Sequence, residues 1–343
     1  MTEDEIVNKL TAMLSSACPE LVEGSKHDTE RHRRIILGIG DDAALWQPSR
    51  SHRSVISTDM LVEGVHFRRD TMSLEDAGWR AMAAALSDLA AMGARPVLAT
   101  VALGVPGANA HEEIMELYRG IAAAAARFGI TIAGGDLSRS DLVTLSVTVV
   151  GEVRNSRIKT RTGAGPGDVL AVTGALGAAR AGLELANQHG LTEGANGDAA
   201  LQAFRRPTPR IAEGRFLGAS ANVTALMDCS DGLPIDARRL CAASDCGAVL
   251  ETIPVADCAR EAAQRLGEDP ELFALGGGED FELLVTVRSR AFRYLAGRYE
   301  KRFKKKLLRV GALRKARGVE WRGTPADRLG WDHFASPTPE KLD

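Results

Sequence analysis

The sequence predicts two mixed domains of the α/β or α+β class, and three observations lead to this prediction. Its 343 residues favour two domains over one. Hydrophobic residues make up 45% of the chain and aromatic residues 5%, and with 35 glycines this composition is typical of an α/β enzyme with substantial cores. Strand-like and helix-like runs also alternate through both halves, as in domains that pack helices on sheets.

The first 155 residues are predicted to form three helices and five strands. We expect an amphipathic helix over 5–14, then a polar loop over 19–33. Longer helices follow at 73–92 and 110–128, and Ser73 is placed to cap the first of them, with Asp76 at the capping-box position. Apolar or alternating runs predict strands near residues 34–40, 55–61, 96–103, 130–133 and 142–153.

The pattern changes near residue 155, and a glycine- and proline-rich loop follows at 161–168. We therefore expect an N-terminal domain over 1–155 and a C-terminal domain over 156–343. Strands of the second half are predicted at 168–174, 223–229, 247–251, 281–287 and 307–312. Its helices are predicted at 176–188, from near Pro207, after residue 231 and at 289–300, with a surface loop at 189–200.

Charge and cysteine content exclude several classes of protein. A formal net charge of −2 gives no reason to expect nucleic-acid binding, and the basic runs at 31–34 and 301–306 are typical of solvated surface. Five cysteines without a C-x-x-C pair argue against a disulfide framework or a structural zinc site. The N-terminus is acidic and has no apolar signal core, and no apolar run approaches the roughly 20 residues that span a membrane. We therefore expect a protein of the reducing cytoplasm.

Acidic residues lie at or just after the ends of four of the predicted strands. Ligand sites in α/β proteins gather at the carboxyl ends of strands. One such aspartate is ordinarily a turn residue or a helix cap, but four strand ends that finish in acid favour a common site. The residues are Asp41 with Asp42, Asp59, Asp136, and Asp228 with Asp231.

Asp88 lies inside the predicted helix at 73–92, on a face otherwise made of alanine and methionine. An ionised carboxylate on an apolar face is costly unless a cation pairs with it. Arg80 or Arg95 is one candidate partner. A bound metal ion is the other, and the remaining acids favour it.

The types of ligand indicate magnesium and phosphoryl chemistry. The sequence has no His/Cys cluster for zinc, whereas carboxylates beside the hydroxyls of Ser57 and Thr58 are the hard oxygen donors that magnesium prefers. Magnesium held by carboxylates normally neutralises phosphates, so phosphoryl transfer is the expected reaction class. The chain has no G-x-x-x-x-G-K-[ST] loop and no protein-kinase signature set, so another architecture must hold the nucleotide.

Nine ordered motifs between residues 34 and 335 resemble those of thiamine-monophosphate kinases. Several are shared with a wider ATP-binding superfamily that includes aminoimidazole ribonucleotide synthetase, selenophosphate synthetase and a hydrogenase-maturation protein. The S-T-D run that leads to G-V-H-F, and the closing W-D-H-F, favour the kinase. The motifs are G-I-G-D-D-A-A (38–44), I-S-T-D-M-L-V-E-G-V-H-F (56–67), L-S-D-L-A-A-M-G-A-R-P (86–96), G-G-D (134–136), R-T-G-A-G-P-G-D (161–168), R-P-T-P-R (206–210), D-C-S-D-G-L (228–233), G-G-G-E-D-F-E-L (276–283) and W-D-H-F (331–334).

The resemblance implies a two-domain synthetase-like fold, whose N-terminal mixed sheet pairs in a homodimer and whose C-terminal α/β domain completes the site. It implies ATP between the domains, several magnesium ions, and direct transfer of the γ-phosphoryl group to thiamine monophosphate, giving thiamine diphosphate. The acceptor is then an anionic phosphate oxygen that needs no strong general base, which agrees with a site rich in acids. No nucleic-acid or membrane partner is expected.

The resemblance also implies roles for particular residues. The metal ligands match Asp42, Ser57, Thr58, Asp59, Asp88, Asp136, Asp228 and Asp231. The nucleotide contacts match Tyr118, Gly135, Asp136, Arg161 and Ser230, and the thiamine monophosphate contacts match His66, Glu279 and Trp331. The carboxylate of Glu279 suits either the aminopyrimidine or the cationic thiazolium, and Trp331 offers a face to a flat cationic ring. Core packing stays open as an alternative role for Tyr118, as does a structural role for His66.

Two other functions stay open. One is that of another ATP-dependent synthetase of the superfamily, of the aminoimidazole ribonucleotide or selenophosphate type. A selenophosphate synthetase would show a reactive cysteine and a lysine in a glycine-rich N-terminal segment, whereas residues 15–40 contain Cys18 beside Pro19 and no such segment. The other is a catalytically silent nucleotide- or metal-binding module, against which the intact set of acids argues.

Overall fold

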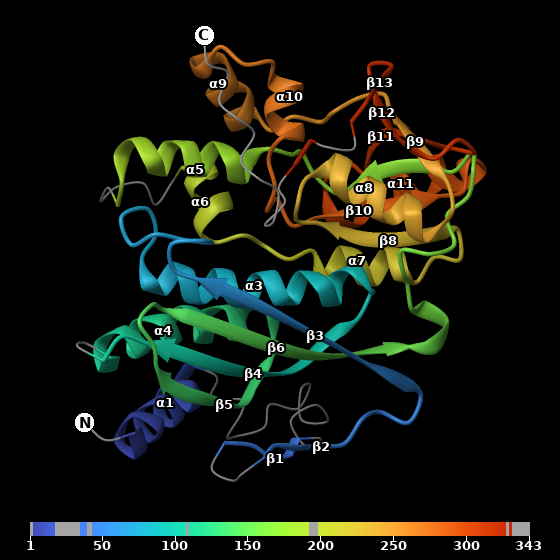
Figure 1. Ribbon diagram of the computed structural model, residues 1–343. Helices are drawn as coiled ribbons and strands as arrows, with labels where there is room; N and C mark the ends of the chain where they lie inside the picture. Colours follow the sequence, from blue (N-terminus) through green and yellow to red (C-terminus); the bar gives the residue numbers. More distant parts are fainter. Residues whose placement is uncertain are drawn as a thin grey trace.

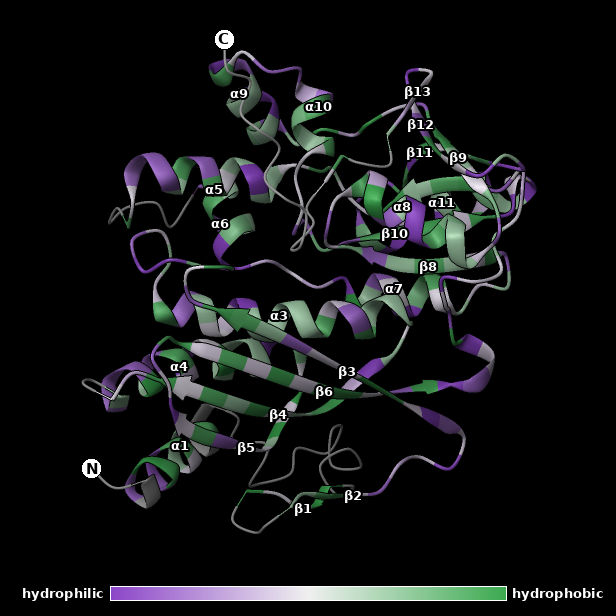
Figure 2. Cartoon of the chain, viewed as in Figure 1, coloured by the Kyte–Doolittle hydropathy of each residue, from purple (hydrophilic) through white to green (hydrophobic). Residues whose placement is uncertain are grey.

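The computed structural model describes residues 3–17, 35–39, 43–107, 110–191, 198–326 and 329–330. The described chain forms two α/β halves, with helix α3 (Leu74–Ala91) running between them (Figure 1). Apolar residues run along the strands of both sheets (Figure 2), and each half has a hydrophobic core of its own. The mixed α/β class is therefore confirmed. Every helix in the described ranges falls short of the length and apolar character that a membrane span requires.

The N-terminal half is built on a four-stranded sheet in the order β3-β6-β4-β5. β4 and β5 pair in parallel, and the other neighbours pair antiparallel. Helices α3 and α4 cover the face of this sheet that carries its buried valines, and α1 packs on α4. The further elements of this half are α1 (Glu3–Ala17), β1 (Ile35–Leu37), β2 (Leu45–Trp46), β3 (His52–Val62), β4 (Arg95–Val105), α4 (Ala110–Phe128), β5 (Thr131–Arg139) and β6 (Thr144–Arg154).

Helix α3 is buried on most sides because it packs against the sheet, against α4 and against the C-terminal half. Ser73 Oγ caps its first turn by accepting the N–H of Asp76 at 3.1 Å, as predicted. Gly78 lets α4 approach closely, since a Cβ there would lie 2.0 Å from the carbonyl oxygen of Leu117. The helix is thus fixed along the boundary between the halves, where side chains that are not covered by packing can contribute to a binding site.

The C-terminal half is built on a seven-stranded sheet in the order β13-β12-β9-β11-β7-β10-β8. β12 and β9 pair in parallel, and the other neighbours pair antiparallel. Its strands are β7 (Val169–Val172), β8 (Val223–Cys229), β9 (Gly247–Leu250), β10 (Glu282–Val287), β11 (Leu308–Arg314), β12 (Gly318–Trp321) and β13 (Thr324–Pro325). Its helices are α5 (Ala178–His189), α6 (Ala199–Arg205), α7 (Ile211–Gly218), α8 (Leu233–Ala243), α9 (Asp257–Leu266), α10 (Pro270–Leu275) and α11 (Ser289–Phe303).

The two sheets are joined by a segment without strands. β6 ends at Arg154, a 3-10 turn spans Asn155–Arg157, and β7 begins at Val169. We propose the domain boundary here, near residue 155.

Several elements differ from those predicted. Asp59 and Asp136 lie inside β3 and β5 and not at strand ends, because backbone pairing continues well past the apolar run of each strand. Helix α7 begins at Ile211, since prolines at 207 and 209 disfavour the helical conformation in the residues before them. Helix α6 begins in the last two residues of the predicted loop at 189–200, and α6, α9, α10, β12 and β13 were not predicted.

Candidate functional site

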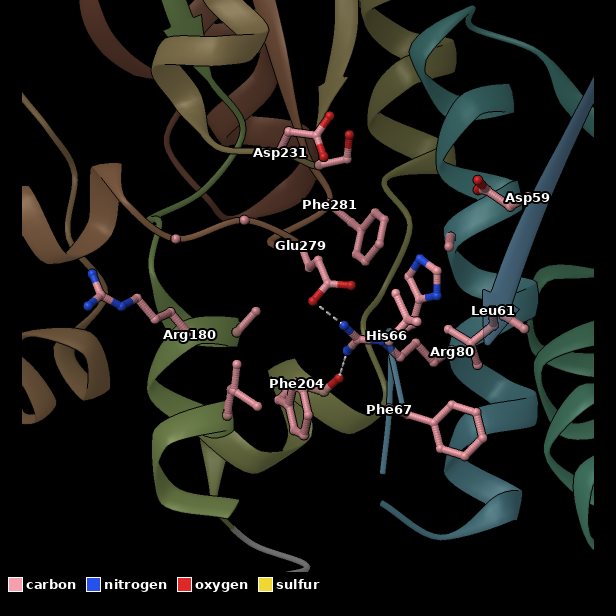
Figure 3. A pocket seen from close by; sticks show the side chains of 18 of the residues that line it. Asp59, Leu61, His66, Phe67, Arg80, Arg180, Phe204, Asp231, Glu279 and Phe281 are labelled. Carbon is pink, nitrogen blue, oxygen red and sulfur yellow. Dashed lines mark hydrogen bonds and ion pairs between the residues drawn. The ribbon is translucent and has the colours of Figure 1, made fainter. Parts of the chain in front are cut away.

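A cavity of about 600 Å³ lies between the two halves. Its walls come from the end of β3 and the loop after it, from α3 and α5, from the end of α6, and from the loops that follow β8 and precede β10. Figure 3 shows Asp59 and Asp231 toward one end of the cavity, and Arg80 with Phe204 toward the other. Seven predicted site residues line it: Asp59, His66, Asp88, Asp228, Ser230, Asp231 and Glu279.

Carboxylates from three elements meet at one end of the cavity, which we call the acid end: Asp59 of β3, Asp88 of α3 and Asp228 of β8, with Asp231 beside them. Burial, and then the charges of Asp88 and Asp231, raise the pKa of Asp59 to about 6. Burial and the charge of Asp88 raise the pKa of Asp228 to about 7, although Ser87 Oγ donates a hydrogen bond to it at 2.8 Å. The acids therefore repel one another, and a bound cation would relieve that repulsion.

Asp88 has no arginine partner in the described part of the chain. Arg80 forms its ion pair with Glu279, and Arg95 forms one with Glu152 at 3.2 Å. The alternative that Arg80 or Arg95 neutralises Asp88 is therefore wrong.

The donors at the acid end are oxygen atoms, which fits magnesium and not zinc. Within the described ranges, no three His, Cys, Asp or Glu side chains stand close enough to hold an ion by themselves. Magnesium commonly binds one or two carboxylates and keeps several waters, and substrate phosphates complete its shell. An open set of carboxylates thus fits an ion that arrives with a nucleotide.

Asp236 positions the loop that carries Ser230 and Asp231. Its buried carboxylate accepts the backbone N–H groups of both residues, at 3.0 Å each. Arg239 forms ion pairs with Asp231 and Asp236, and burial followed by the charge of Asp231 raises the pKa of Asp236 to about 6. Sequence reasoning missed Asp236. The available signal was an acid in the first turn of the helix that follows D-C-S-D-G-L.

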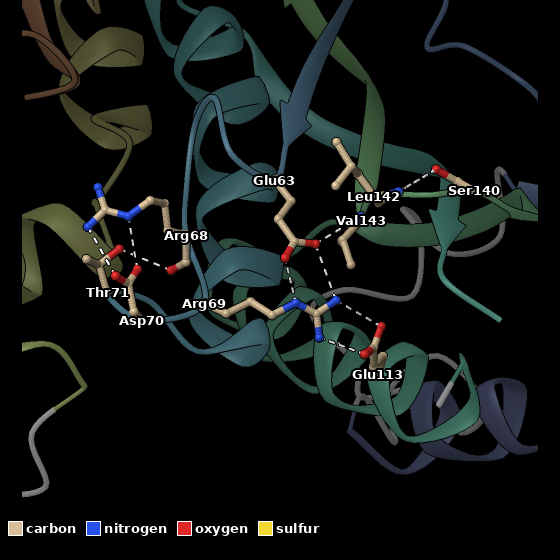
Figure 4. Close-up of polar contacts among 9 residues, drawn as sticks. All are labelled: Glu63, Arg68, Arg69, Asp70, Thr71, Glu113, Ser140, Leu142 and Val143. Carbon is tan, nitrogen blue, oxygen red and sulfur yellow. Dashed lines mark hydrogen bonds and ion pairs between the residues drawn. The ribbon is translucent and has the colours of Figure 1, made fainter. Parts of the chain in front are cut away.

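Ion pairs fix the loop between β3 and α3 that carries His66 (Figure 4). Arg69 lies between two carboxylates, with N···O distances of 2.7 Å to Glu63 and 2.6 Å to Glu113. The hydrogen bond from Arg69 lowers the pKa of Glu63, which also accepts a backbone N–H from the residue before β6 at 3.1 Å. His66 Nδ1 accepts the N–H of Val62 at 3.0 Å, so the neutral ring carries its proton on Nε2.

The G-G-G-E-D-F-E segment sends successive side chains into different surroundings. Glu279 and Phe281 line the cavity, and both have positive φ angles, of 62° and 49°. Asp280 instead accepts the N–H groups of Gly177 at 2.8 Å and Ala179 at 3.3 Å, so it caps the start of α5. Burial raises the pKa of Asp280 to about 7. The segment thus fastens α5 to the cavity wall while it presents Glu279.

Two predicted nucleotide contacts lie away from the cavity. Tyr118 on α4 is 5% exposed within the N-terminal core, and burial raises its pKa to about 12. This position supports the packing role, and the nucleotide contact stays a prediction. Arg161 is exposed in the loop before β7, where its carbonyl oxygen accepts a hydrogen bond from Ser244 Oγ at 2.7 Å. Its side chain is likewise not part of the cavity wall.

The sheet separates three other predicted residues from the acid end. Thr58 is exposed on the face opposite to Asp59, where its hydroxyl contacts Thr148 Oγ1 at 3.0 Å. Gly135 and Asp136 lie on β5, the far edge strand, about 14 Å from β3 by three strand spacings. Within one chain the structure therefore does not bring Thr58, Gly135 or Asp136 to the cavity.

Ser57 does reach the acid end, because its hydroxyl donates a hydrogen bond to Asp88. Asp42 and Trp331 lie outside the described residues, and so do Asp41 and the W-D-H-F motif. Sequence reasoning considered Arg80 only as a partner for Asp88, and so missed its place at the other end of the cavity.

The chain matches two family models. These are the AIR synthase related protein N-terminal domain, over residues 40–153, and the AIR synthase related protein C-terminal domain, over residues 165–293. Among curated proteins, the thiamine-monophosphate kinase of Rhodopirellula baltica is 40% identical over 269 residues, which cover 76% of this chain and 78% of the relative. That of Escherichia coli K12 is 37% identical over 275 residues, which cover 78% and 79%.

Solved structures share the fold. A thiamine-monophosphate kinase from Stenotrophomonas maltophilia K279a superposes with a TM-score of 0.79 at 34% identity, covering 92% of this chain and 96% of its own. AaThiL, solved in complex with AMPPCP and TMP, has a TM-score of 0.74 at 31% identity, with 84% and 89% covered. The E. coli hydrogenase maturation protein HypE, at 20% identity and a TM-score of 0.72, shares the fold alone.

Proposed function

This chain belongs to the thiamine-monophosphate kinase family, and from that premise we propose that it transfers the γ-phosphoryl group of ATP to thiamine monophosphate, giving thiamine diphosphate. The observation that carries the proposal is the acid end of the cavity, where Asp59, Asp88 and Asp228 repel one another and no arginine of the described residues pairs with Asp88. AaThiL holds AMPPCP and TMP in a complex, which supports a site for nucleotide and substrate in this family.

Magnesium ions would be held by Asp59, Asp88, Asp228 and Asp231, with Ser57 beside them. When bound, magnesium supplies positive charge that neutralises phosphate oxygens during phosphoryl transfer. The residues of this chain fix the carboxylates: Ser57 and Ser87 orient Asp88 and Asp228, and Asp236 holds the Asp231 loop. We assign no separate general base, because the accepting phosphate oxygen is already anionic. Asp42 remains a predicted further ligand.

Thiamine monophosphate would lie along the cavity with its phosphate toward the acid end. His66 and Glu279 line the cavity and are the described candidates for contact with its rings, and Trp331 remains a predicted contact. Ser230 borders the acid end and is the proposed nucleotide contact. The ion pairs of Arg69 with Glu63 and Glu113 fix the loop that carries His66 against the end of β3 and against α4. His66 is therefore positioned before substrate binds.

We propose a homodimer that pairs the four-stranded sheets through their outer faces. Ile56 and Met60 of β3 are 67% and 58% exposed on this face, and Thr58 lies between them. Exposed apolar side chains on one sheet face support an interface. The same face carries Asp136, so a second copy seated there would bring that residue and Gly135 to a shared boundary.

The four free cysteines of the described residues support a reducing compartment, the cytoplasm.

An Ile56→Asp variant is expected to weaken dimerisation at least about tenfold, since a carboxylate would be buried against the partner sheet. Sedimentation equilibrium of the wild type and the variant measures the dissociation constant. Leu266→Asp is the matched control, because Leu266 is also exposed, at 43%, but lies on α9. A monomeric wild type, or an Ile56→Asp dimer as tight as the Leu266→Asp dimer, would contradict this interface.

The proposed reaction is tested by incubating the protein with ATP, magnesium and thiamine monophosphate. We expect thiamine diphosphate and ADP in equal amounts, and no turnover of free thiamine or of an amidine ribonucleotide offered in parallel. Chromatography with mass detection identifies the products. Consumption of the amidine ribonucleotide with no thiamine diphosphate formed would assign the chain to the synthetase reaction instead.

A further inference from the structure

The end of the cavity opposite to the acids contains a buried arginine. Arg80 of α3 is 1% exposed and lines the cavity. Its guanidinium forms an ion pair with Glu279, donates from Nη1 to the carbonyl oxygen of Phe204, and lies 4.9 Å from the centroid of the Phe204 ring (Figure 3). Its Nε and Nη2 have no hydrogen-bond partner among the described residues, and Nη2 contacts Glu279 as an ion pair only. A buried, incompletely bonded guanidinium beside a cavity indicates a role toward whatever fills that cavity.

Glu279 is exposed to the cavity on its other side. Its side chain is 41% exposed, whereas that of its partner Arg80 is 1% exposed. Its backbone is fixed by a positive φ of 62° and by an N–H···O bond of 2.6 Å to Ser230. Arg80 therefore holds the Glu279 carboxylate from behind while leaving an oxygen atom accessible. A carboxylate whose charge is balanced in this way is a poor counter-ion for a cationic ring but a good acceptor for a neutral N–H donor.

The distance between the acid end and Arg80 indicates where each part of the substrate lies in the cavity. Arg80 and Asp88 are eight residues apart on α3, which corresponds to roughly 12 Å along the helix axis. Thiamine monophosphate consists, in order, of a phosphate, an ethyl chain, a cationic thiazolium and a methylene-linked aminopyrimidine. With the phosphate at the acid end, the thiazolium lies midway and the aminopyrimidine reaches the Arg80 end. Apolar side chains there, including Phe204 and Leu183, suit a flat neutral ring.

We propose that Arg80 is a positioning residue that fixes Glu279 to accept the exocyclic amino N–H of the substrate's aminopyrimidine. This inference rests on the proposed function and chooses the aminopyrimidine over the thiazolium as the group that Glu279 recognises. Arg80 thereby sets specificity without contact with the reacting phosphates. It also joins the halves at the substrate end, since it lies on α3 while Glu279 and Phe204 belong to the C-terminal half.

The test compares thiamine monophosphate with its analogue in which a hydroxyl replaces the amino group of the pyrimidine. The wild type is expected to prefer the amino substrate in kcat/KM at least about 100-fold, as sites built to bond a substrate N–H do. Arg80→Met and Glu279→Gln are each expected to lower this ratio about tenfold or more. In Arg80→Met, KM for thiamine monophosphate should rise while kcat changes only a few-fold, and Arg80→Lys should restore part of the ratio.

The ratio is independent of the fraction of folded enzyme, because both substrates are compared on the same preparation. If Arg80→Met does not fold, Glu279→Gln and Arg80→Lys decide the outcome. Arg322→Met is the matched control, since Arg322 likewise forms ion pairs with carboxylates, Asp269 at 3.1 Å and Glu271 at 2.8 Å, and lies 4.3 Å from the centroid of an aromatic ring, that of Trp321, but outside the cavity. Its ratio should equal that of the wild type.

Two results would overturn the inference. A wild-type ratio retained in Glu279→Gln and in the folded Arg80 variants would make Arg80 a structural link only, while the kinase reaction itself stands. A wild-type protein that does not convert thiamine monophosphate at all would overturn the proposed function, and this inference with it.

Discussion

Replacement of Asp88 by asparagine is expected to reduce kcat about 10³-fold or more and to leave the protein folded. The residue sits on the buried helix α3, accepts a hydrogen bond from Ser57, and has no arginine partner in the described chain. Asparagine keeps the shape and one acceptor oxygen but removes the charge that a magnesium ion requires. Loss of one preorganised charge-stabilising group in phosphoryl or acyl transfer commonly costs about this factor.

The free energy of unfolding of the Asp88→Asn variant distinguishes a metal-ligand role of Asp88 from a structural role. The charge of Asp88 raises the pKa of both Asp59 and Asp228, so its removal relieves repulsion and should hold or increase the free energy of unfolding without magnesium. Urea denaturation and steady-state kinetics on the same preparation measure both quantities. Asp257→Asn, an exposed aspartate on α9, is the control and should keep the wild-type rate. An Asp88→Asn enzyme with a near-normal rate would exclude Asp88 as a metal ligand.

The second large effect is a loss of stability as pH rises in the absence of magnesium and nucleotide. Burial raises the pKa of Asp228 and Asp280 to about 7, and that of Asp59 to about 6, whereas the unfolded chain has ordinary values near 4. Between about pH 4 and 7 the folded state therefore binds more protons than the unfolded state. The free energy of unfolding then falls as pH rises through this window. We expect a decrease of a few kcal/mol between pH 5 and 8, measured by urea denaturation.

Two variants at the hydrogen bond between Ser87 and Asp228 test why the free energy of unfolding falls as pH rises. Asp228→Asn removes one of the three titrating groups, so it should make the fall in stability with pH smaller and raise the stability at pH 8 by about 1–3 kcal/mol. Ser87→Ala removes the hydrogen bond that lowers the pKa of Asp228, so it should move the slope to higher pH. Magnesium with ATP should restore stability at pH 8, because it binds the ionised carboxylates. A stability that rises from pH 5 to 8 in the wild type would contradict the picture of mutually repelling buried acids.

Local patterns in the sequence were enough to predict much of the fold. Helix α4 begins and ends where its alanine-rich amphipathic pattern does, and α3 begins at the Ser73 cap. The alternating run before residue 155 forms β6 as expected. The lengths of β3 and β5 were less predictable, because their outer halves are polar and are held by pairing with strands distant in sequence. This is why Asp59 and Asp136 were expected at strand ends.

Site residues could be predicted where they belong to a recognisable motif. They could not be predicted where their role depends on contact with a residue that is distant in the sequence. Asp59, Asp88, Asp228 and Asp231 were predicted, and the structure brings them to one cavity. Arg80 was missed because its partner Glu279 lies 199 residues away and meets it only when the halves pack. We expected Asp136 to lie beside these four aspartates, but the strand order places it at the opposite edge of the sheet from Asp59. A sequence pattern contains no information on that order.

The fate of the γ-phosphorus of ATP tests the kinase assignment most directly. The protein is incubated with magnesium, thiamine monophosphate and ATP that carries an isotope label in its γ-phosphoryl group, and the products are separated. We expect the label in the terminal phosphate of thiamine diphosphate, one per ADP formed, with little label in free phosphate. Label released as inorganic phosphate while thiamine monophosphate remains unchanged would contradict direct phosphoryl transfer to this acceptor.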